Sequence, residues 1–413
     1  MPVGAGFIPA RIGENKKMTE HKKLQPEIRF AGFTDDWEQR KLGDVVNVLD
    51  NLRIPIAASQ RLEGVTPYYG ANGIQGYIDG FTHDGEFVLV AEDGANDLIN
   101  YPVQYVSGKV WINNHAHVLQ GIKNVANNLF LVYRIKSMDM TKYLVGGGRT
   151  KLNASVMKDI ELHLPNYAEQ TQIGNFFKQL DDTIALHQRT LEKYQKLKVS
   201  YLEKMFPKEN ERYPELRFPN FTDAWEQRKL NEISIKVIDK NVNNEFWETF
   251  TNSAELGVIS QRDFFDKDIS NSENINNYYI VKNNDFIYNP RISNFAPVGP
   301  IRRNKLGRTG VMSPLYYVFR TSGVDHRFLE TFFETTKWHD YMKLNGDTGA
   351  RADRLSIKDS LFEKMPIMFP SLEEQTQIGN FFKQLDDTIA LHQKELAKYQ
   401  QIKAACLEKM FVD

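Results

Sequence analysis

Apolar side chains recur in alternating steps of three and four residues between residues 173 and 205, the pattern of a long helix that packs along another helix. The positions are Ile173, Phe177, Leu180, Ile184, His187, Leu191, Tyr194, Lys198, Tyr201 and Met205, of which His187 and Lys198 interrupt the apolar stripe. Residues 169–188 recur without a change at residues 374–393, 205 residues further along the chain. The sequence therefore predicts one long helix that is used twice.

The two helices have matching start signals. Asn166 and Glu169 before the first helix, and Ser371 and Glu374 before the second, have the spacing of a capping box. Pro207 ends the first helix after Phe206, because proline lacks the amide donor that the next turn needs. A helix over residues 167–206 is ~60 Å long, which is long for a globular core.

A second repeat predicts the domain organisation. Residues 28–42 recur as residues 216–230, both ending in Trp-Glu-Gln-Arg-Lys-Leu, and the segment between this motif and the long helix is 17 residues longer in the second copy. The predicted parts are a flexible leader (1–23), a first globular domain (24–165), a first coiled-coil helix (166–206), a linker (207–215), a second globular domain (216–370) and a second coiled-coil helix (371–413).

The short linker predicts how the two helices pair. A parallel pairing needs a long return path, whereas an antiparallel pairing needs only short connections. Short strands with glycine and asparagine turns, such as residues 86–91 and 284–288, indicate mixed α/β globular domains. The expected fold class is α+β, with two mixed α/β domains separated by two long antiparallel coiled-coil helices and an internal pseudo-twofold repeat.

Composition narrows the class of protein. The net charge is −1 and hydrophobic content is 41%, which is ordinary for a globular protein. No apolar run approaches the roughly 18 residues of a membrane span, so no membrane association is expected. Cys406 is the only cysteine, which excludes a disulfide within the chain and favours the reducing cytoplasm.

The repeated Trp-Glu-Gln-Arg-Lys-Leu motif, the repeated Glu-Gln-x-x-Ile-Gly helices and the two unequal intervening segments resemble the specificity subunit of type I restriction–modification systems. This resemblance implies that the two globular domains are target recognition domains, each recognising one half of a bipartite site in double-stranded DNA. The helices would serve as the spacer, since ~60 Å corresponds to roughly 17 base pairs of duplex.

The resemblance also implies partners. Two methyltransferase subunits would dock on the helices, and restriction subunits would join through them. The chain itself would have no catalytic activity and bind no cofactor, because S-adenosylmethionine, ATP and Mg are expected on the partner subunits. The duplicated helix surface with Phe176, Phe381 and the acidic pairs 181–182 and 386–387 is the expected docking surface for two copies of one partner.

Catalytic motifs are weak in this sequence. Residues 288–291 (Tyr-Asn-Pro-Arg) depart from an amino-methyltransferase motif, where a second proline stands in place of Arg291, and residues 146–151 lack the spacing of a phosphate loop. His115 and His117 could face one side of a strand as metal ligands, but two polar side chains of a strand are the favoured interpretation because a third ligand at typical spacing is missing.

Candidate DNA contacts come from three stretches. The turn after residue 68 offers Tyr69, Asn72 and Gln75. The side-chain amides of Asn72 and Gln75 can form paired hydrogen bonds with adenine. Residues 286–310 hold five cations without an acid, and basic glycine turns precede both helices. These stretches supply the remaining candidates: Asn289, Arg291, Asn294, Arg302, Arg303, Lys305 and Arg308 from the run, and Arg149, Lys151, Arg351 and Arg354 from the turns. Arginines that tie a turn to its own domain are an equally weighted alternative.

Two other functions stay open at the level of sequence. One is a self-contained DNA methyltransferase or endonuclease, which would bind a cofactor or cleave DNA as an isolated chain. The other is a coiled-coil scaffold without DNA affinity, which would lack the salt-sensitive binding that phosphate contacts produce. The recognised sequence, the spacer length and the methylated base do not follow from the sequence.

Overall fold

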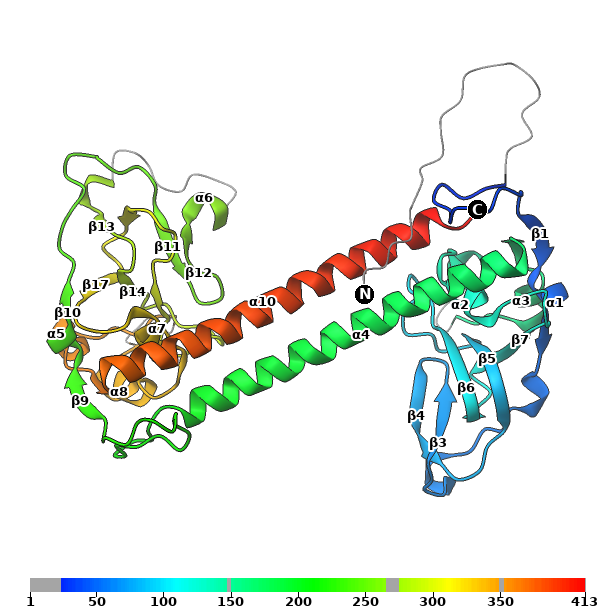
Figure 1. Ribbon diagram of the computed structural model, residues 1–413, viewed down its shortest axis with the longest axis horizontal. Helices are drawn as coiled ribbons and strands as arrows, with labels where there is room; N and C mark the ends of the chain where they lie inside the picture. Colours follow the sequence, from blue (N-terminus) through cyan, green and yellow to red (C-terminus); the bar gives the residue numbers. More distant parts are fainter. Residues whose placement is uncertain (1–23, 147–149, 265–274, 349–352, 413) are drawn as a thin grey trace, which may run out of the picture. The chain divides into compact units, whose positions relative to one another are not determined.

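A computed structural model describes residues 24–146, 150–264, 275–348 and 353–412. The chain divides into two compact units, unit 1 (residues 1–189 with 393–413) and unit 2 (residues 190–392). The predicted leader and the candidates Arg149 and Arg351 lie outside the described residues. Two 38-residue helices, α4 (Tyr167–Lys204) and α10 (Leu372–Lys409), each begin in one unit and end in the other (Figure 1, green and orange to red).

Unit 1 is built on a six-stranded sheet in the order β2-β7-β5-β6-β3-β4. Its strands are β2 (Val46–Val48), β3 (Thr66–Gly70), β4 (Gly73–Ile78), β5 (His83–Ala91), β6 (Val103–Ile112) and β7 (Ala116–Gly121). Strand β5 is apolar on both faces because both are covered. Val88 and Val90 belong to the main core with the long helices, whereas Phe87 and Leu89 belong to a smaller core on the opposite face.

Short elements complete unit 1. They are α1 (Leu42–Val45), η1 (Asp50–Leu52), η2 (Ala58–Gln60), α2 (Asn128–Lys136), η3 (Met140–Tyr143), α3 (Ala154–Lys158) and an antiparallel ribbon of β1 (Glu38–Lys41) with β8 (Glu161–Leu164). Helix α2 packs against the sheet and contributes Phe130 and Leu131 to the main core. Ribbon strand β1 comes from the repeated Trp-Glu-Gln-Arg-Lys-Leu motif, and the second copy of this motif forms β9 (Glu226–Lys229), which pairs antiparallel with β18 (Pro366–Phe369) in unit 2.

Unit 2 contains a four-stranded sheet in the order β10-β17-β14-β15, the order of β2-β7-β5-β6 in unit 1. The strands are β9 (Glu226–Lys229), β10 (Ser234–Lys236), β11 (Phe250–Ser253), β12 (Gly257–Ser260), β13 (Tyr279–Val281), β14 (Phe286–Tyr288), β15 (Ile301–Arg303), β16 (Gly310–Met312), β17 (Tyr317–Thr321) and β18 (Pro366–Phe369). The helices are α5 (Leu230–Ile233), α6 (Gln261–Phe264), η4 (Ile275–Asn277), α7 (His326–Glu334), α8 (His339–Asn345) and α9 (Asp359–Phe362). Each unit therefore has its own central sheet, and four strands follow the same order in both although the sequences differ.

The long helices pair antiparallel in each unit, as predicted. In unit 1, His187 of α4 stacks on Tyr399 of α10 with ring centroids 5.6 Å apart. In unit 2, Tyr194 of α4 stacks on His392 of α10 at 5.9 Å. The histidine that interrupts the apolar stripe is therefore part of the helix–helix contact, because its ring faces a tyrosine.

Lysines at the second interruption of the stripe form ion pairs across the helices. Lys198 contacts Asp386 at 2.6 Å in unit 2, and Lys403 contacts Asp181 at 2.5 Å in unit 1. Burial alone would lower the pKa of Lys198, but the charges of Glu334 and Asp386 outweigh burial and raise it. Repeated positions thus make the same contact in both units.

Candidate nucleic-acid interface

Three segments that are distant in sequence meet at one place in unit 1. The β3–β4 turn contributes Asn72, whose amide donates to the Gly94 carbonyl at 2.9 Å and accepts from the Asn96 amide at 3.0 Å. Residue Asp93 forms a backbone bridge with Lys151, and the Leu152 amide donates to the Glu92 carbonyl at 2.7 Å. We call residues 70–73, 92–102 and 150–152 loop face 1.

The same three segments meet in unit 2. The Asn289 side chain donates to the Asn252 carbonyl at 2.8 Å, next to the β11–β12 turn. Residue Arg291 forms a backbone bridge with Arg354, and the Leu355 amide donates to the Pro290 carbonyl at 2.8 Å. We call residues 252–257, 289–300 and 353–355 loop face 2. Both loop faces contain the loop between corresponding strands, β5–β6 in unit 1 and β14–β15 in unit 2.

Known proteins resemble this chain over nearly all of its length. A family model described as the type I restriction modification DNA specificity domain matches residues 34–196 and again residues 222–401. The MjaVIII specificity subunit of Methanocaldococcus jannaschii, a type I restriction enzyme component, is 22% identical over 408 residues, 91% of this chain and 92% of that one. A putative type I specificity subunit of Haemophilus influenzae is 44% identical over 147 residues, 36% of this chain and 37% of that one.

A solved structure supports the same fold. The crystal structure of the type I restriction–modification S subunit from M. genitalium matches with a TM-score of 0.64 at 14% identity, over 94% of this chain and 100% of that one. The chain belongs to the type I restriction–modification DNA specificity family.

Family membership decides between the hypotheses left open by the sequence. This family is the non-catalytic specificity component of type I restriction–modification systems and acts on DNA within the complex. The hypothesis of a self-contained methyltransferase or endonuclease is therefore set aside. Within the part of the chain that the structure describes, no helix has an apolar stretch long enough to cross a membrane.

The candidate residues of unit 1 lie on or beside loop face 1. Tyr69 is half-buried in β3, the Asn72 amide is occupied by the 92–102 loop, and Gln75 is exposed on β4. Lys151 contacts Glu92 at 2.9 Å and remains partly exposed. The turn predicted to contact DNA is thus adjacent to the predicted basic turn, although Asn72 has a structural contact of its own.

The predicted basic surface of residues 286–310 is wrong in one respect, because acids from distant segments lie against it. Arg303 and Lys305 both contact Glu330 of α7 at 2.7 Å. Arg308 contacts Glu248 at 2.6 Å and holds the pKa of that carboxyl below its usual range. Three cations of this stretch are therefore paired with carboxylates, although the stretch itself contains no acid.

Other cations and amides of this stretch divide between structural and exposed positions. Arg302 donates to the Ala254 carbonyl at 3.1 Å, and the Asn289 amide is occupied as described above. Arg291 is 72% exposed, with an ion pair to Asp353 as long as 3.9 Å, and Asn294 is exposed in the same loop. Arg354 is half-buried opposite Arg291. Loop face 2 therefore brings together Arg291, Asn294 and Arg354.

Both interpretations of His115 and His117, as metal ligands or as polar side chains of a strand, placed the two residues in a strand, which is wrong for His115. His115 lies in the turn before β7 and contacts Asp93 at 2.5 Å, whereas His117 contacts Asp50 at 2.6 Å and the Leu152 carbonyl at 2.8 Å. Ligand-type atoms of Asp50, Glu92 and His117 lie within 4.8 Å of one another. The Arg53 guanidinium and the Lys151 ammonium contact these carboxylates, so the negative charge of the cluster is already balanced by cationic side chains.

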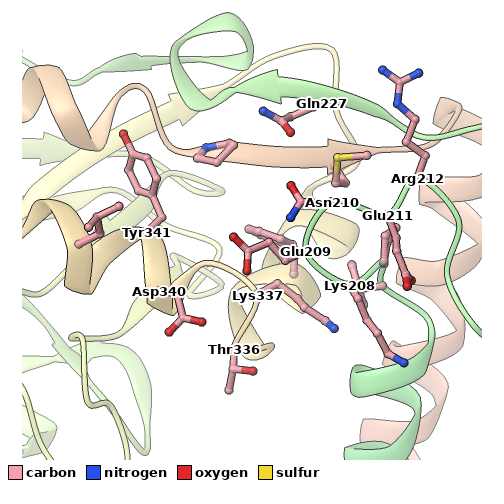
Figure 2. Close-up of a pocket in the computed structure, with 16 residues that line it drawn as sticks. Lys208, Glu209, Asn210, Glu211, Arg212, Gln227, Thr336, Lys337, Asp340 and Tyr341 are labelled. Carbon is pink, nitrogen blue, oxygen red and sulfur yellow. The ribbon is translucent and has the colours of Figure 1, made fainter.

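A cleft of about 820 Å³ lies in unit 2, away from loop face 2 in sequence. It is lined by Phe206, linker residues 207–212, Phe332 of α7, side chains between residues 336 and 344, and strands β9 and β18. Figure 2 shows Lys208, Glu209, Lys337 and Asp340 around the opening. Because charges of both signs line this cleft, it has no preference for an anionic polymer.

Sequence reasoning missed the apolar side chains of the two loop faces. Ile99 is 87% exposed and Phe295 is 75% exposed, each within the loop between corresponding strands. Leu256 in the β11–β12 turn is also exposed. The sequence did contain a signal for their exposure. Each residue lies in a short segment rich in asparagine, aspartate and serine, and such segments form surface loops, so an apolar residue within one is expected to be exposed.

Proposed function

We propose that this chain gives a type I restriction–modification complex its DNA sequence specificity, with one loop face for each half of a bipartite site. The observation that carries this proposal is the duplicated loop face, since the same three segments converge in both units while their side chains differ. Because the two loop faces have corresponding backbone segments but different side chains, they are suited to recognise different DNA sequences in the two half-sites.

Continuous helices support a role for α4 and α10 as the spacer between the half-sites. Each helix has 38 residues and passes from one unit into the other without a break. At ~1.5 Å per residue a helix of this kind has a defined length. We propose that this length sets the unread gap within the bipartite site.

The proposed partners are double-stranded DNA, two methyltransferase subunits, and restriction subunits that join through them, in the cytoplasm. S-adenosylmethionine, ATP and Mg would be bound by those subunits. The docking surface predicted from sequence needs revision, because Phe176 contacts Phe30 and Phe381 contacts Tyr201 within their units. Asp181 and Asp386 are likewise occupied by lysines across the helix pair.

Leu186 and Leu391 offer a better docking surface. They are the same residue of the repeat and are 57% and 56% exposed. Exposed Gln179 and Asp182 precede Leu186, and the same residues recur before Leu391. Two equal surfaces predict two copies of one partner.

Replacement of one leucine tests this stoichiometry. Leu391→Glu should lower the ratio of methyltransferase subunits to this chain from two to one, because it places a charge in one of two apolar contacts. Mass measurement of the purified complex gives the ratio, with Gln393→Glu on an exposed but different face of the same helix as the control. An unchanged ratio would show that partners dock elsewhere.

Exchange of one recognition domain tests the proposed function as a whole. Residues 231–370 would be replaced by the corresponding segment of another family member, and genomic methylation would be mapped in cells that contain the complex. One half of the methylated sequence should change while the other half and the gap stay the same. Loss or change of both halves would contradict a division of recognition between the two units.

A further inference from the structure

Each loop face projects a bulky apolar side chain. Ile99 and Phe295 are among the most exposed apolar residues in the described part of the chain, at 87% and 75%. Both lie in the loop that joins corresponding strands, and both loops contact the segment with Lys151 or Arg354. A single exposed apolar residue needs no explanation, but recurrence at corresponding places of two unlike sequences does.

Local hydrogen bonds hold both loops in defined conformations. The Asp97 carboxylate accepts from the backbone amides of Ile99 and Asn100, at 2.9 Å and 2.8 Å. In unit 2, Ser293 and Ala296 exchange backbone hydrogen bonds of 3.0 Å and 3.1 Å around Phe295. The apolar side chains are therefore presented to solvent by ordered turns.

Gly299 fixes the base of the Phe295 loop. Its φ is +83°, and a Cβ there would lie 2.2 Å from the Asn289 carbonyl oxygen. Only glycine combines this left-handed conformation with such a close approach. Any other residue at position 299 would therefore push apart the two ends of the loop, at Asn289 and Gly299.

We infer that Ile99 and Phe295 are apolar wedges that enter the base stack of their respective half-sites, an inference that rests on the proposed function. Neither side chain can hydrogen-bond a base edge, whereas isoleucine and phenylalanine are side chains that proteins insert between base steps. Exposed Arg291 and nearby Arg354 are cations in position to contact the flanking phosphates. A methyltransferase takes its target base out of the stack, so unstacking beside it lowers the cost of that step.

Fluorescence of 2-aminopurine, which rises when the base loses its stacking partner, tests this inference. The intact complex of this chain with its methyltransferase subunits would bind duplexes that carry 2-aminopurine in one half-site or the other, once genomic methylation has identified the sequence. Phe295→Ala should lower the fluorescence rise in the half-site of unit 2 and keep that of unit 1, and Ile99→Ala should do the reverse. Each substitution should weaken binding about ten-fold.

Two further variants serve as controls. Phe295→Leu keeps a bulky apolar side chain and should retain most of the signal. Ile235→Ala removes an exposed apolar residue of edge strand β10, which pairs with Arg320 near the opposite end of β14, and should leave binding unchanged. Because all these side chains are exposed, melting temperatures should stay the same.

The outcomes separate this inference from the proposed function. Unchanged binding and fluorescence in Phe295→Ala would overturn the wedge, while methylation of a bipartite site would still uphold the proposed function. Weaker binding with the full fluorescence rise would also overturn it, since Phe295 would then contact a base without unstacking. A wild-type complex that methylates no bipartite site would instead contradict the proposed function.

Discussion

Single repeated residues attach each long helix to its own unit. Asn166 and Ser371 accept the amides of Glu169 and Glu374, as the capping prediction requires. The glutamate side chains do not complete capping boxes, however. They form two-point ion pairs of 2.7–2.8 Å with Arg29 in unit 1 and Arg217 in unit 2. In each unit, an arginine of the repeat that begins the globular domain thus pairs with a glutamate of the repeated long helix.

Loss of one of these carboxylates should destabilise unit 2. Glu374 is buried and Arg217 nearly so, so Glu374→Gln leaves a guanidinium without its counter-charge and should cost about 3–5 kcal/mol. Chemical denaturation followed by fluorescence gives the change in unfolding free energy. Glu373→Gln, at the exposed neighbouring position, is the control. Equal effects of the two substitutions would contradict a special role for the ion pair.

Asp50 gives unit 1 a pH-dependent contribution. Burial alone would raise the pKa of Asp50, but hydrogen bonds from His117 and the Val118 amide and the Arg53 charge outweigh burial and lower it. The resulting stability is fully present above the unfolded pKa of about 3.9 and is lost as pH falls through the lower folded pKa.

Asp50→Asn should therefore lower the melting temperature at pH 7, with a loss of about 1.5–3 kcal/mol. The difference from the parent protein should shrink as pH falls below 4, because the parent then loses the same contribution. Melting curves between pH 2.5 and 7 measure it, with exposed Asp84→Asn as the control. A difference that is constant with pH would show that the Asp50 charge is not responsible.

At the scale of elements, a repeated glycine lets a short helix approach each long helix. A Cβ at Gly174 would lie 2.8 Å from the Leu129 Cβ of α2, and one at Gly379 would lie 2.8 Å from the Arg327 Cβ of α7. Gln170 and Gln375 accept the backbone amides of Asn127 and Asp325, the N-cap residues of those short helices. The repeat therefore encodes the contact between each long helix and its short helix, α2 in unit 1 and α7 in unit 2.

Gly379→Val should force α7 away from α10 and cost about 1–3 kcal/mol through overpacking. Gln384→Val on the exposed face of the same helix carries the same β-branched side chain and should cost far less. Thermal unfolding of the two variants measures the difference. If both variants melt alike, helix propensity and not close packing explains the effect.

At the scale of the whole molecule, the end of each long helix contacts the start of a globular domain in the same way in both units. In unit 2, the Leu216 amide donates to the Lys204 carbonyl at 2.9 Å, across the continuous linker. In unit 1, the Ile28 amide donates to the Lys409 carbonyl at 3.0 Å, although these residues lie near opposite ends of the chain. Trp37 and Trp225 correspondingly contact Phe411 and Phe206.

A circular permutant should therefore fold and retain its specificity. Val412 would be joined to Leu24 through Lys-Glu-Asn-Glu, a copy of residues 208–211, and the chain would be opened between Asn210 and Glu211. Methylation mapping should return the parent's sequence. A permutant opened at buried Ile287 in β14 is the control and should not fold. Failure of both permutants would contradict equivalence of the two junctions.

The sequence by itself determined the repeats, the two long helices, their antiparallel pairing and the family, because periodicity, linker length and repetition are properties of the linear chain. Tertiary structure alone decided which charges are neutralised and which side chains lie on the loop faces. Glu248 and Glu330 lie far from residues 286–310 in sequence, yet they pair with Arg308 and Arg303 because ion pairs depend on distance in space. For the same reason, the exposure of Ile99 and Phe295 became visible only when three remote segments had been brought together.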